Sequence, residues 1–171
     1  FSLQLLPMKN VLIVYLLSLF TLSAQAIDIF IAKDAQGCLP YAAEELQSHL
    51  RLAGLEKVTI HRTDDLLAVS DLSKKAQQSI VLGQNMFVKE HSPNVGQHSD
   101  EFVIKVLDPK VLLIAGFDEP QFHVNYDKVP SSCGTLYGVY RFLESLGFRW
   151  FYPGEEGRVV PRLKQISFKN K

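Results

Sequence analysis

The sequence holds one pair of adjacent carboxylates beside a group of aromatic residues, Glu155 and Glu156 in the stretch RWFYPGEEGRVVP. Two carboxylates about 5 to 9.5 Å apart across a sugar form the catalytic pair of most glycosidases. Neighbouring residues of an extended chain point to opposite sides, however. The Pro-Gly before the pair and the glycine after it are typical turn residues. We therefore interpret the pair as a solvated turn and assign no catalytic residue to this chain.

Aromatic residues gather just before this turn, at Phe148, Trp150, Phe151 and Tyr152. Such rings commonly cover the end of a hydrophobic core, and an outward ring can also stack on a sugar or contact a neighbouring domain. Both interpretations are open at the level of the sequence. If a sugar is bound here, Arg149 and Trp150 are the candidate substrate-binding residues.

Other arrangements that carry chemistry are weak in this sequence. The five histidines form no HExxH motif or other close ligand pair, so we predict no metal site and no cofactor. No glycine-rich phosphate loop occurs, and Ser131-Ser132 lacks the small residues that flank the nucleophile of an α/β-hydrolase. Cys38 and Cys133 have no basic neighbour close in sequence that would activate a thiol.

The same two cysteines also have a structural interpretation. Two cysteines of an exported protein can pair, and Cys38 and Cys133 stand at the starts of the two main helices predicted below. If those helices lie parallel on one face of a sheet, their starts are neighbours and a disulfide can join them. Two separate buried thiols are the alternative.

Length and charge restrict the class of protein. The 171 residues include 18 basic and 18 acidic side chains. A nucleic-acid-binding protein normally shows a basic excess, so we predict no nucleic-acid partner. The length fits one domain with an appended segment.

The first 26 residues have the pattern of a secretory signal peptide. Met8-Lys9 gives a charged start, residues 11–22 are mainly apolar, and Ala24-Gln25-Ala26 is a small-x-small site, so we predict cleavage after Ala26 and treat residues 1–7 as upstream leader. A membrane-spanning helix requires roughly 20 apolar residues, so we predict no stable membrane anchor. The mature chain is expected to be secreted or periplasmic.

Hydrophobic patterns predict the elements that position these residues. Short apolar runs predict strands at 27–32, 57–62, 79–83, 101–107 and 111–116, and a tight turn at 108–110 makes the last two a hairpin. Apolar residues at three- and four-residue spacing predict helices at 40–53 and 133–147, with Ser132 as the second N-cap. Residues 63–78 and 84–99 are expected to be loops with at most weak helical turns, residues 117–132 a long loop, and residues 159–160 and 165–168 two short closing strands.

This order of strands and helices predicts an α/β or α+β sandwich, in which one mixed β-sheet carries two main helices. Gly134 and Gly138 are four residues apart in the second helix. Small residues at this spacing indicate close packing on the sheet rather than a nucleotide site.

The stretch GTLYGVYRFLESLGFRWFYPGEEGRVVP, from Gly134 to Pro161, resembles the N-terminal domain of bacterial alpha-glucuronidases and their relatives. The helix pattern G-T-x-Y-x-V-Y-x-F-L-E-x-L-G, the following R-W-x-x-P-G and the Val-Pro exit carry the likeness. The AAEELQSHL helix, the SIVLG strand and the D-E-F-x-I hairpin occur in the order that the family would have. The resemblance covers about residues 27–168.

The resemblance implies a beta-hexosaminidase-like sandwich of zincin-like topology, without zinc, at residues 27–171. In the family this domain precedes a (β/α)8 barrel that carries the catalytic carboxylates. The sequence lacks that barrel, which suggests a fragment of a longer gene product. The implied partners are a C-terminal catalytic barrel of the same protein and a glycan such as glucuronic-acid-decorated xylan.

The sequence supports three hypotheses of function. The first is the accessory domain of an exported glycoside hydrolase in polysaccharide breakdown, which would have no glycosidase activity by itself. The second is a stand-alone secreted carbohydrate-binding module. The third is an interaction domain of an exported protein that is not a hydrolase.

Overall fold

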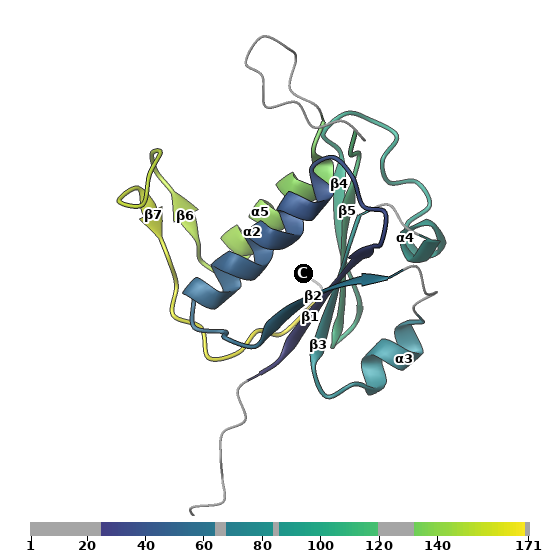
Figure 1. Cartoon of the computed structure of the whole chain (residues 1–171), viewed down its shortest axis with the longest axis horizontal. Helices are drawn as coiled ribbons and strands as arrows, with labels where there is room; N and C mark the ends of the chain where they lie inside the picture. The colour runs from purple at the N-terminus through teal and green to yellow at the C-terminus, as the bar shows by residue number, and fades with distance from the viewer. Residues whose placement is uncertain (1–24, 64–67, 84–85, 120–131, 170–171) are drawn as a thin grey trace, which may run out of the picture.

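A computed structural model describes residues 25–63, 68–83, 86–119 and 132–169. Its elements follow in chain order (Figure 1): β1 Ile27–Ala32, α2 Leu39–Leu52, β2 Val58–Thr63, α3 Val69–Lys74, β3 Gln78–Leu82, α4 Met86–His91, β4 Phe102–Asp108, β5 Val111–Gly116, α5 Gly134–Ser145, β6 Arg149–Trp150 and β7 Arg158–Val159.

Five of the strands form one mixed sheet in the order β2-β1-β3-β5-β4. The first four run parallel, and β4 is antiparallel to β5 at one edge. Parallel strands covered on both faces are apolar throughout, which explains why every residue of β5 is buried. The hairpin and the mixed α/β class predicted from the sequence are confirmed.

The sheet is covered unequally on its two faces. The long helices α2 and α5 lie side by side on one face, while α3 and α4 lie on the other (Figure 1). Strand residues alternate between the two faces, so Ile27, Ile29 and Ile31 face the long helices, and Phe30 faces the short ones. The larger core therefore lies beneath α2 and α5.

Glycines allow α5 to approach the sheet closely. A Cβ on Gly134 would overlap the carbonyl oxygen of Glu101, and a Cβ on Gly138 would lie 2.7 Å from Cγ2 of Ile114. The predicted packing role of these two glycines is confirmed. Phe148, directly after the helix, is fully buried and closes the end of the core.

Two sequence predictions differ from the structure. Residues 165–168 form no strand; Ile166 and Phe168 are buried, and the ring of Phe168 lies 6.2 Å from that of Phe142. The strand predicted at 159–160 is present one residue earlier as β7, and it pairs with the two-residue strand β6. Ser132 is not the N-cap of α5, because Cys133 occupies that position.

Two predicted segments fall mostly outside the described residues. Of the predicted signal peptide, only Gln25 and Ala26 are described, and of the long loop at 117–132 only its ends. The Gln25 side chain donates a hydrogen bond to the Ile166 carbonyl at 2.9 Å and accepts one from the Ile166 amide at 2.7 Å. Cleavage after Ala26 would remove both bonds. No helix in the described part of the chain is long and apolar enough to span a membrane.

Candidate functional site

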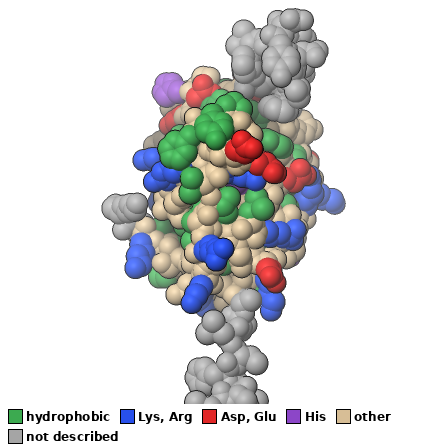
Figure 2. Space-filling model, turned by 90° about the vertical axis from the view of Figure 1, so that its left-hand side faces the viewer, with side chains coloured by type: hydrophobic (Ala, Val, Ile, Leu, Met, Phe, Trp, Pro, Cys, Tyr) green, Lys and Arg blue, Asp and Glu red, His purple; other side chains and the backbone are tan. Residues whose placement is uncertain are grey.

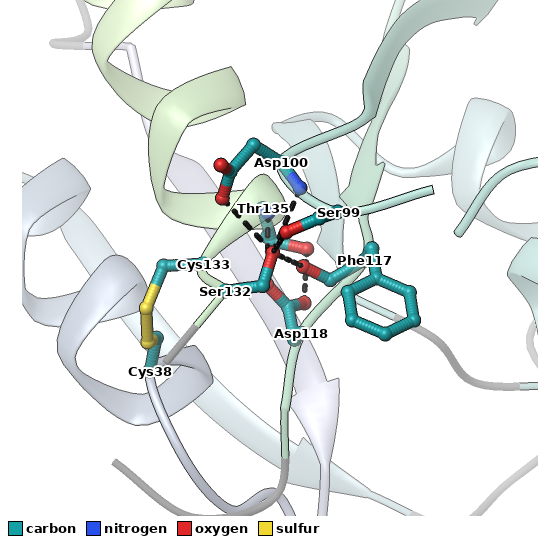
Figure 3. The surroundings of a disulfide bond; sticks show 8 residues. All are labelled: Cys38, Ser99, Asp100, Phe117, Asp118, Ser132, Cys133 and Thr135. Carbon is teal, nitrogen blue, oxygen red and sulfur yellow. Dashed lines mark hydrogen bonds between the residues drawn. A yellow bond between two sulfur atoms is a disulfide. The ribbon is translucent and has the colours of Figure 1, made fainter. Parts of the chain in front are cut away.

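The starts of the two long helices meet at the carboxyl end of the sheet. Cys38 is the N-cap residue of α2 and Cys133 that of α5, and a disulfide joins them with their Cα atoms 5.8 Å apart (Figure 3). This separation lies within the usual range for disulfides. The arrangement is the one expected if both helices lie parallel on one face, and it leaves no free thiol at either position.

Asp118 caps helix α5 from outside the helix. Its Oδ1 accepts a hydrogen bond from the Thr135 backbone N–H at 2.9 Å, and its Oδ2 accepts one from Thr135 Oγ1. The same hydroxyl accepts a bond from the Gly116 amide at 2.9 Å. Burial raises the pKa of the Asp118 carboxyl, and the two bonds from Thr135 oppose that rise. A carboxylate at this position satisfies helix N–H groups and complements the helix dipole.

Ser132 and Asp100 form a second small network beside the disulfide (Figure 3). The Asp100 amide donates to Ser132 Oγ at 2.7 Å, and Ser132 Oγ donates to Asp100 Oδ1 at 2.9 Å. Nucleophilic activation of a serine requires an adjacent base, most often a histidine. No histidine contacts Ser132 in the hydrogen bonds of the described residues. We therefore interpret this network as a structural link between Ser132, just before α5, and Asp100, just before β4.

The strands β6 and β7 form a hairpin that extends beyond the long helices (Figure 1). Phe151 is 73% exposed and Tyr152 57% exposed, and Val159 is exposed as well. Figure 2 faces this side of the molecule and shows hydrophobic side chains gathered on it, with acidic side chains beside them. The hairpin thus displays apolar surface that the described residues do not cover.

Glu155 and Glu156 lie in the turn of this hairpin, and both side chains are exposed. The Glu155 carboxylate is 94% exposed and lies 3.9 Å from the Arg158 guanidinium. The Glu156 carbonyl accepts a hydrogen bond of 3.2 Å from the Tyr152 hydroxyl. The geometry is that of a solvated turn.

Arg149 and Trp150, the sequence-predicted substrate-binding candidates, have different surroundings. The Arg149 guanidinium donates to the Glu144 carbonyl at 2.7 Å and to the Phe148 carbonyl at 2.5 Å, so it satisfies one carbonyl in the last turn of α5 and one just beyond the helix. The Trp150 ring stacks on Phe148 with centroids 6.0 Å apart and remains 36% exposed. Trp150 therefore presents one part to the core and another to solvent.

A polar cluster lies behind the Trp150 ring, between α2 and α5. The Tyr140 hydroxyl donates to Glu45 Oε2 at 2.8 Å, and His49 Nδ1 donates to the Glu45 carbonyl at 2.8 Å. Burial and the Glu45 carboxylate raise the pKa of Tyr140. The His49 ring is buried edge-on to Trp150, with centroids 5.6 Å apart. These contacts anchor the hairpin to the helical layer.

Comparisons with known proteins gave no match: no family model, no curated protein and no solved structure is significantly similar to this chain. The function must therefore be argued from the site itself. Across the described residues, no group of three or more His, Cys, Asp or Glu side chains could hold a metal ion.

Sequence reasoning missed Asp118, Asp100 and Glu45 as structural partners. Asp118 and Thr135 are separated by 17 positions and Glu45 and Tyr140 by 95, so no local pattern connects them. The position of Asp118 could have indicated its role, because it lies two residues after the buried strand β5. Polar residues that follow parallel strands often lie near the starts of helices. All three of these polar groups hold elements of the fold together, and the exposed hairpin is the part suited to contact another molecule.

Proposed function

We propose that this chain is the non-catalytic N-terminal domain of an exported glycoside hydrolase resembling alpha-glucuronidases, with the zincin-like topology of beta-hexosaminidase-like domains. The observation that carries the proposal is the β6–β7 hairpin, which exposes Phe151, Tyr152 and Val159. A lone two-stranded hairpin is marginally stable in water, and contiguous exposed apolar surface marks interaction sites. We infer that a neighbouring domain covers this hairpin.

The catalytic carboxylates of such an enzyme would lie on polypeptide outside this sequence. Two carboxylates at the sites described above already have structural roles in the fold. Those of Glu45 and Asp118 accept hydrogen bonds from Tyr140 and Thr135, respectively. These roles favour an accessory domain over a catalytic one.

Export from the cytoplasm is part of the proposal. The signal-peptide pattern of residues 1–26 indicates a secreted or periplasmic protein. The Cys38–Cys133 disulfide supports this location, since disulfides persist mainly in oxidising compartments. The proposed substrate, a glucuronic-acid-decorated polysaccharide, is also found outside the cell.

Activity measurements on two proteins test the proposal. The purified chain and a longer gene product that includes the downstream polypeptide are assayed on an aryl glucuronide and on glucuronic-acid-decorated xylan. We expect turnover by the longer protein only. Turnover by the chain alone, or a longer product that hydrolyses no glycoside, would contradict the proposal.

The contact itself can be tested with F151S/Y152S. In the longer protein, this double substitution should lower the midpoint of thermal unfolding, because the covered apolar surface is lost. In the isolated chain both side chains are exposed, so the midpoint should stay nearly unchanged. Equal effects in the two proteins would exclude a domain contact at the hairpin.

A stand-alone carbohydrate-binding module is the second candidate, favoured by the partly exposed Trp150 ring next to Phe151. Aromatic faces bind sugar rings by stacking. Trp150 is the only tryptophan in the sequence, so its fluorescence reports on this surface alone. A change that saturates with added xylan oligosaccharide would support this function, and a flat titration would count against it.

A further inference from the structure

The strand β4 forms one edge of the five-stranded sheet, and among the described residues its only partner strand is β5. Next to this pair, the Phe117 amide donates to the Glu101 carbonyl at 2.9 Å. Hydrogen bonding to the partner alternates along antiparallel strands. The odd-numbered residues of β4 therefore direct their backbone groups to β5, and Phe102, Ile104 and Val106 direct theirs outward. In the described part of the chain, no backbone hydrogen bond meets these outward groups.

The sequence of β4, FVIKVLD, offers little protection for this edge. Natural edge strands are commonly blocked by charged side chains, by proline or by a covering element. The lysine in the middle of β4, Lys105, donates its ammonium group to the His91 carbonyl at 2.7 Å. Its charge is therefore held toward α4, on the face opposite the long helices. The strand remains a template for pairing with another strand.

A groove of about 860 Å³ runs along the same edge on the side of the long helices. It lies between β4, the C-terminal half of α5 and the segment that follows β7. Its floor is made of apolar side chains, which are Ile104, Val106, Leu112, Phe142, Leu146 and Phe168. A groove of this size accommodates several side chains of a bound segment.

The rim of the groove is positively charged. Arg141, Arg149 and Lys169 line it, and Glu144 is the single acidic residue among its lining residues. The Glu144 carboxylate is paired with Arg141 at 3.0 Å. The hydrogen bonds of Arg149 go to carbonyls, and no carboxylate of the described residues forms an ion pair with it. The groove therefore presents a net positive rim around an apolar floor.

We propose that β4 binds an extended peptide segment with acidic side chains, which adds as a further strand to the sheet. The outward backbone groups of Phe102, Ile104 and Val106 would supply the main-chain hydrogen bonds, as in known β-strand addition. Alternate side chains of the bound segment would enter the groove. Apolar ones would contact the floor, and acidic ones would approach the positively charged rim formed by Arg141, Arg149 and Lys169.

A second copy of this chain fits the edge less well. Two β4 strands paired around a two-fold axis would place two positively charged rims next to each other. The strand itself contributes a single carboxylate, Asp108, at its last position. Charge complementarity therefore favours an acidic peptide. The proposal uses none of the exposed apolar residues of the β6–β7 hairpin, of which only Arg149 lines the groove, and it does not depend on the proposed function.

Fluorescence anisotropy of a labelled peptide tests this proposal with the purified full chain. The probe is Glu-Thr-Val-Thr-Val-Thr-Glu, which places two valines and two glutamates on one side of a strand. We expect saturable binding that weakens with added salt. A peptide with lysine in place of glutamate, and one with N-methylated backbone amides on its pairing edge, should each bind at least about tenfold more weakly.

Two variants locate the binding to the edge and the groove. Ile104→Pro removes one outward N–H, a change that edge strands tolerate, and R141E/K169E reverses the charge of the rim. Each should weaken binding at least about tenfold. K89E/K164E, which changes the same amount of charge at exposed residues outside the groove lining, should bind like the wild type. If I104P does not fold, the charge variant and the N-methylated peptide still decide the question.

Three results would overturn the proposal. The first is no binding of the acidic probe up to about 1 mM. The second is binding that neither N-methylation of the probe nor R141E/K169E weakens, because that would be non-specific. The third is self-association of the chain that I104P abolishes, which would assign the edge to a second copy.

Discussion

The Tyr140 hydroxyl donates a hydrogen bond of 2.8 Å to Glu45 Oε2 and thereby joins α5 to α2 on the side of the β6–β7 hairpin. Burial, reinforced by the Glu45 carboxylate, raises the pKa of Tyr140. The bond links the protonation of one tyrosine to the packing of the two helices that carry the hairpin.

This relationship predicts a specific loss of stability at alkaline pH. Because the folded-state pKa of Tyr140 is raised, its contribution is fully present below the unfolded value near 10 and is lost as the pH rises through the raised value. Y140F lacks the hydroxyl and therefore this pH-dependent contribution, so the difference in free energy of unfolding between wild type and Y140F should shrink between pH 8 and pH 11. Urea unfolding at the two pH values measures it. Y137F, a change at an exposed tyrosine of the same helix, is the matched control; equal pH profiles for wild type and Y140F would contradict the prediction.

Asp118 should show the corresponding effect at acidic pH. Burial raises the pKa of its carboxyl, so the stability that it contributes is fully present below the ordinary value near 3.8 and declines as the pH rises through the raised pKa. D118N, which stays neutral, should therefore gain stability relative to wild type from pH 3 to pH 7. D118A removes the helix cap altogether and should cost about 1 to 2 kcal/mol in the free energy of unfolding. Parallel pH profiles for wild type and D118N would exclude the assigned cause.

Loss of the Cys38–Cys133 disulfide should destabilise the fold. The bridge closes a loop of sequence separation 95, and removal of such a native disulfide costs about 2 to 4 kcal/mol. We expect C38S/C133S to unfold at lower urea concentration than the wild type, and a reductant to lower the midpoint of the wild type only. Two titratable thiols in the unfolded, unreduced protein would show that the bridge does not form.

Alanine at the two glycines of α5 should have unequal effects. At Gly134 the added methyl group would meet backbone atoms of Glu101 and Phe117, which cannot move independently of the strand. At Gly138 it would meet the Ile114 side chain, which can shift. G134A should therefore lower the free energy of unfolding by about 1 to 3 kcal/mol, and G138A by less. The reverse order in chemical denaturation would refute this account of helix–sheet packing.

Neutral substitutions at the hairpin turn should have little effect. Both acidic side chains are exposed, so E155Q/E156Q should change the free energy of unfolding by no more than about 0.5 kcal/mol. In a longer gene product with glycosidase activity, the same variant should keep its kcat. A loss of kcat at unchanged stability would reassign the pair to catalysis.

Local patterns predicted the elements, because their causes are local. The apolar strand VLLIAG ends at a glycine as expected, and the Asp108–Lys110 turn produces the hairpin of β4 and β5. The starts of α2 and α5 were placed within two residues, which brought Cys38 and Cys133 together as one of two alternatives.

Contacts between residues distant in sequence explain the two features that local sequence patterns predicted wrongly. Ser132 has the residue type of an N-cap but lies one residue before that position; its hydroxyl forms hydrogen bonds with Asp100, and Asp118 takes the capping role. Ile166 and Phe168 alternate like strand residues, yet Phe168 packs against the helix residue Phe142. In both cases a partner distant in sequence competes with the local preference.

The disulfide closes a covalent ring that contains β2, β3, β4 and β5, together with α2, α3 and α4. A single proteolytic cut anywhere between Cys38 and Cys133 would leave both pieces attached to each other. A nicked molecule would keep its intact mass, apart from one added water, until a reductant separated the fragments. This topology therefore keeps the two pieces of a chain that a protease has cut within the ring covalently joined.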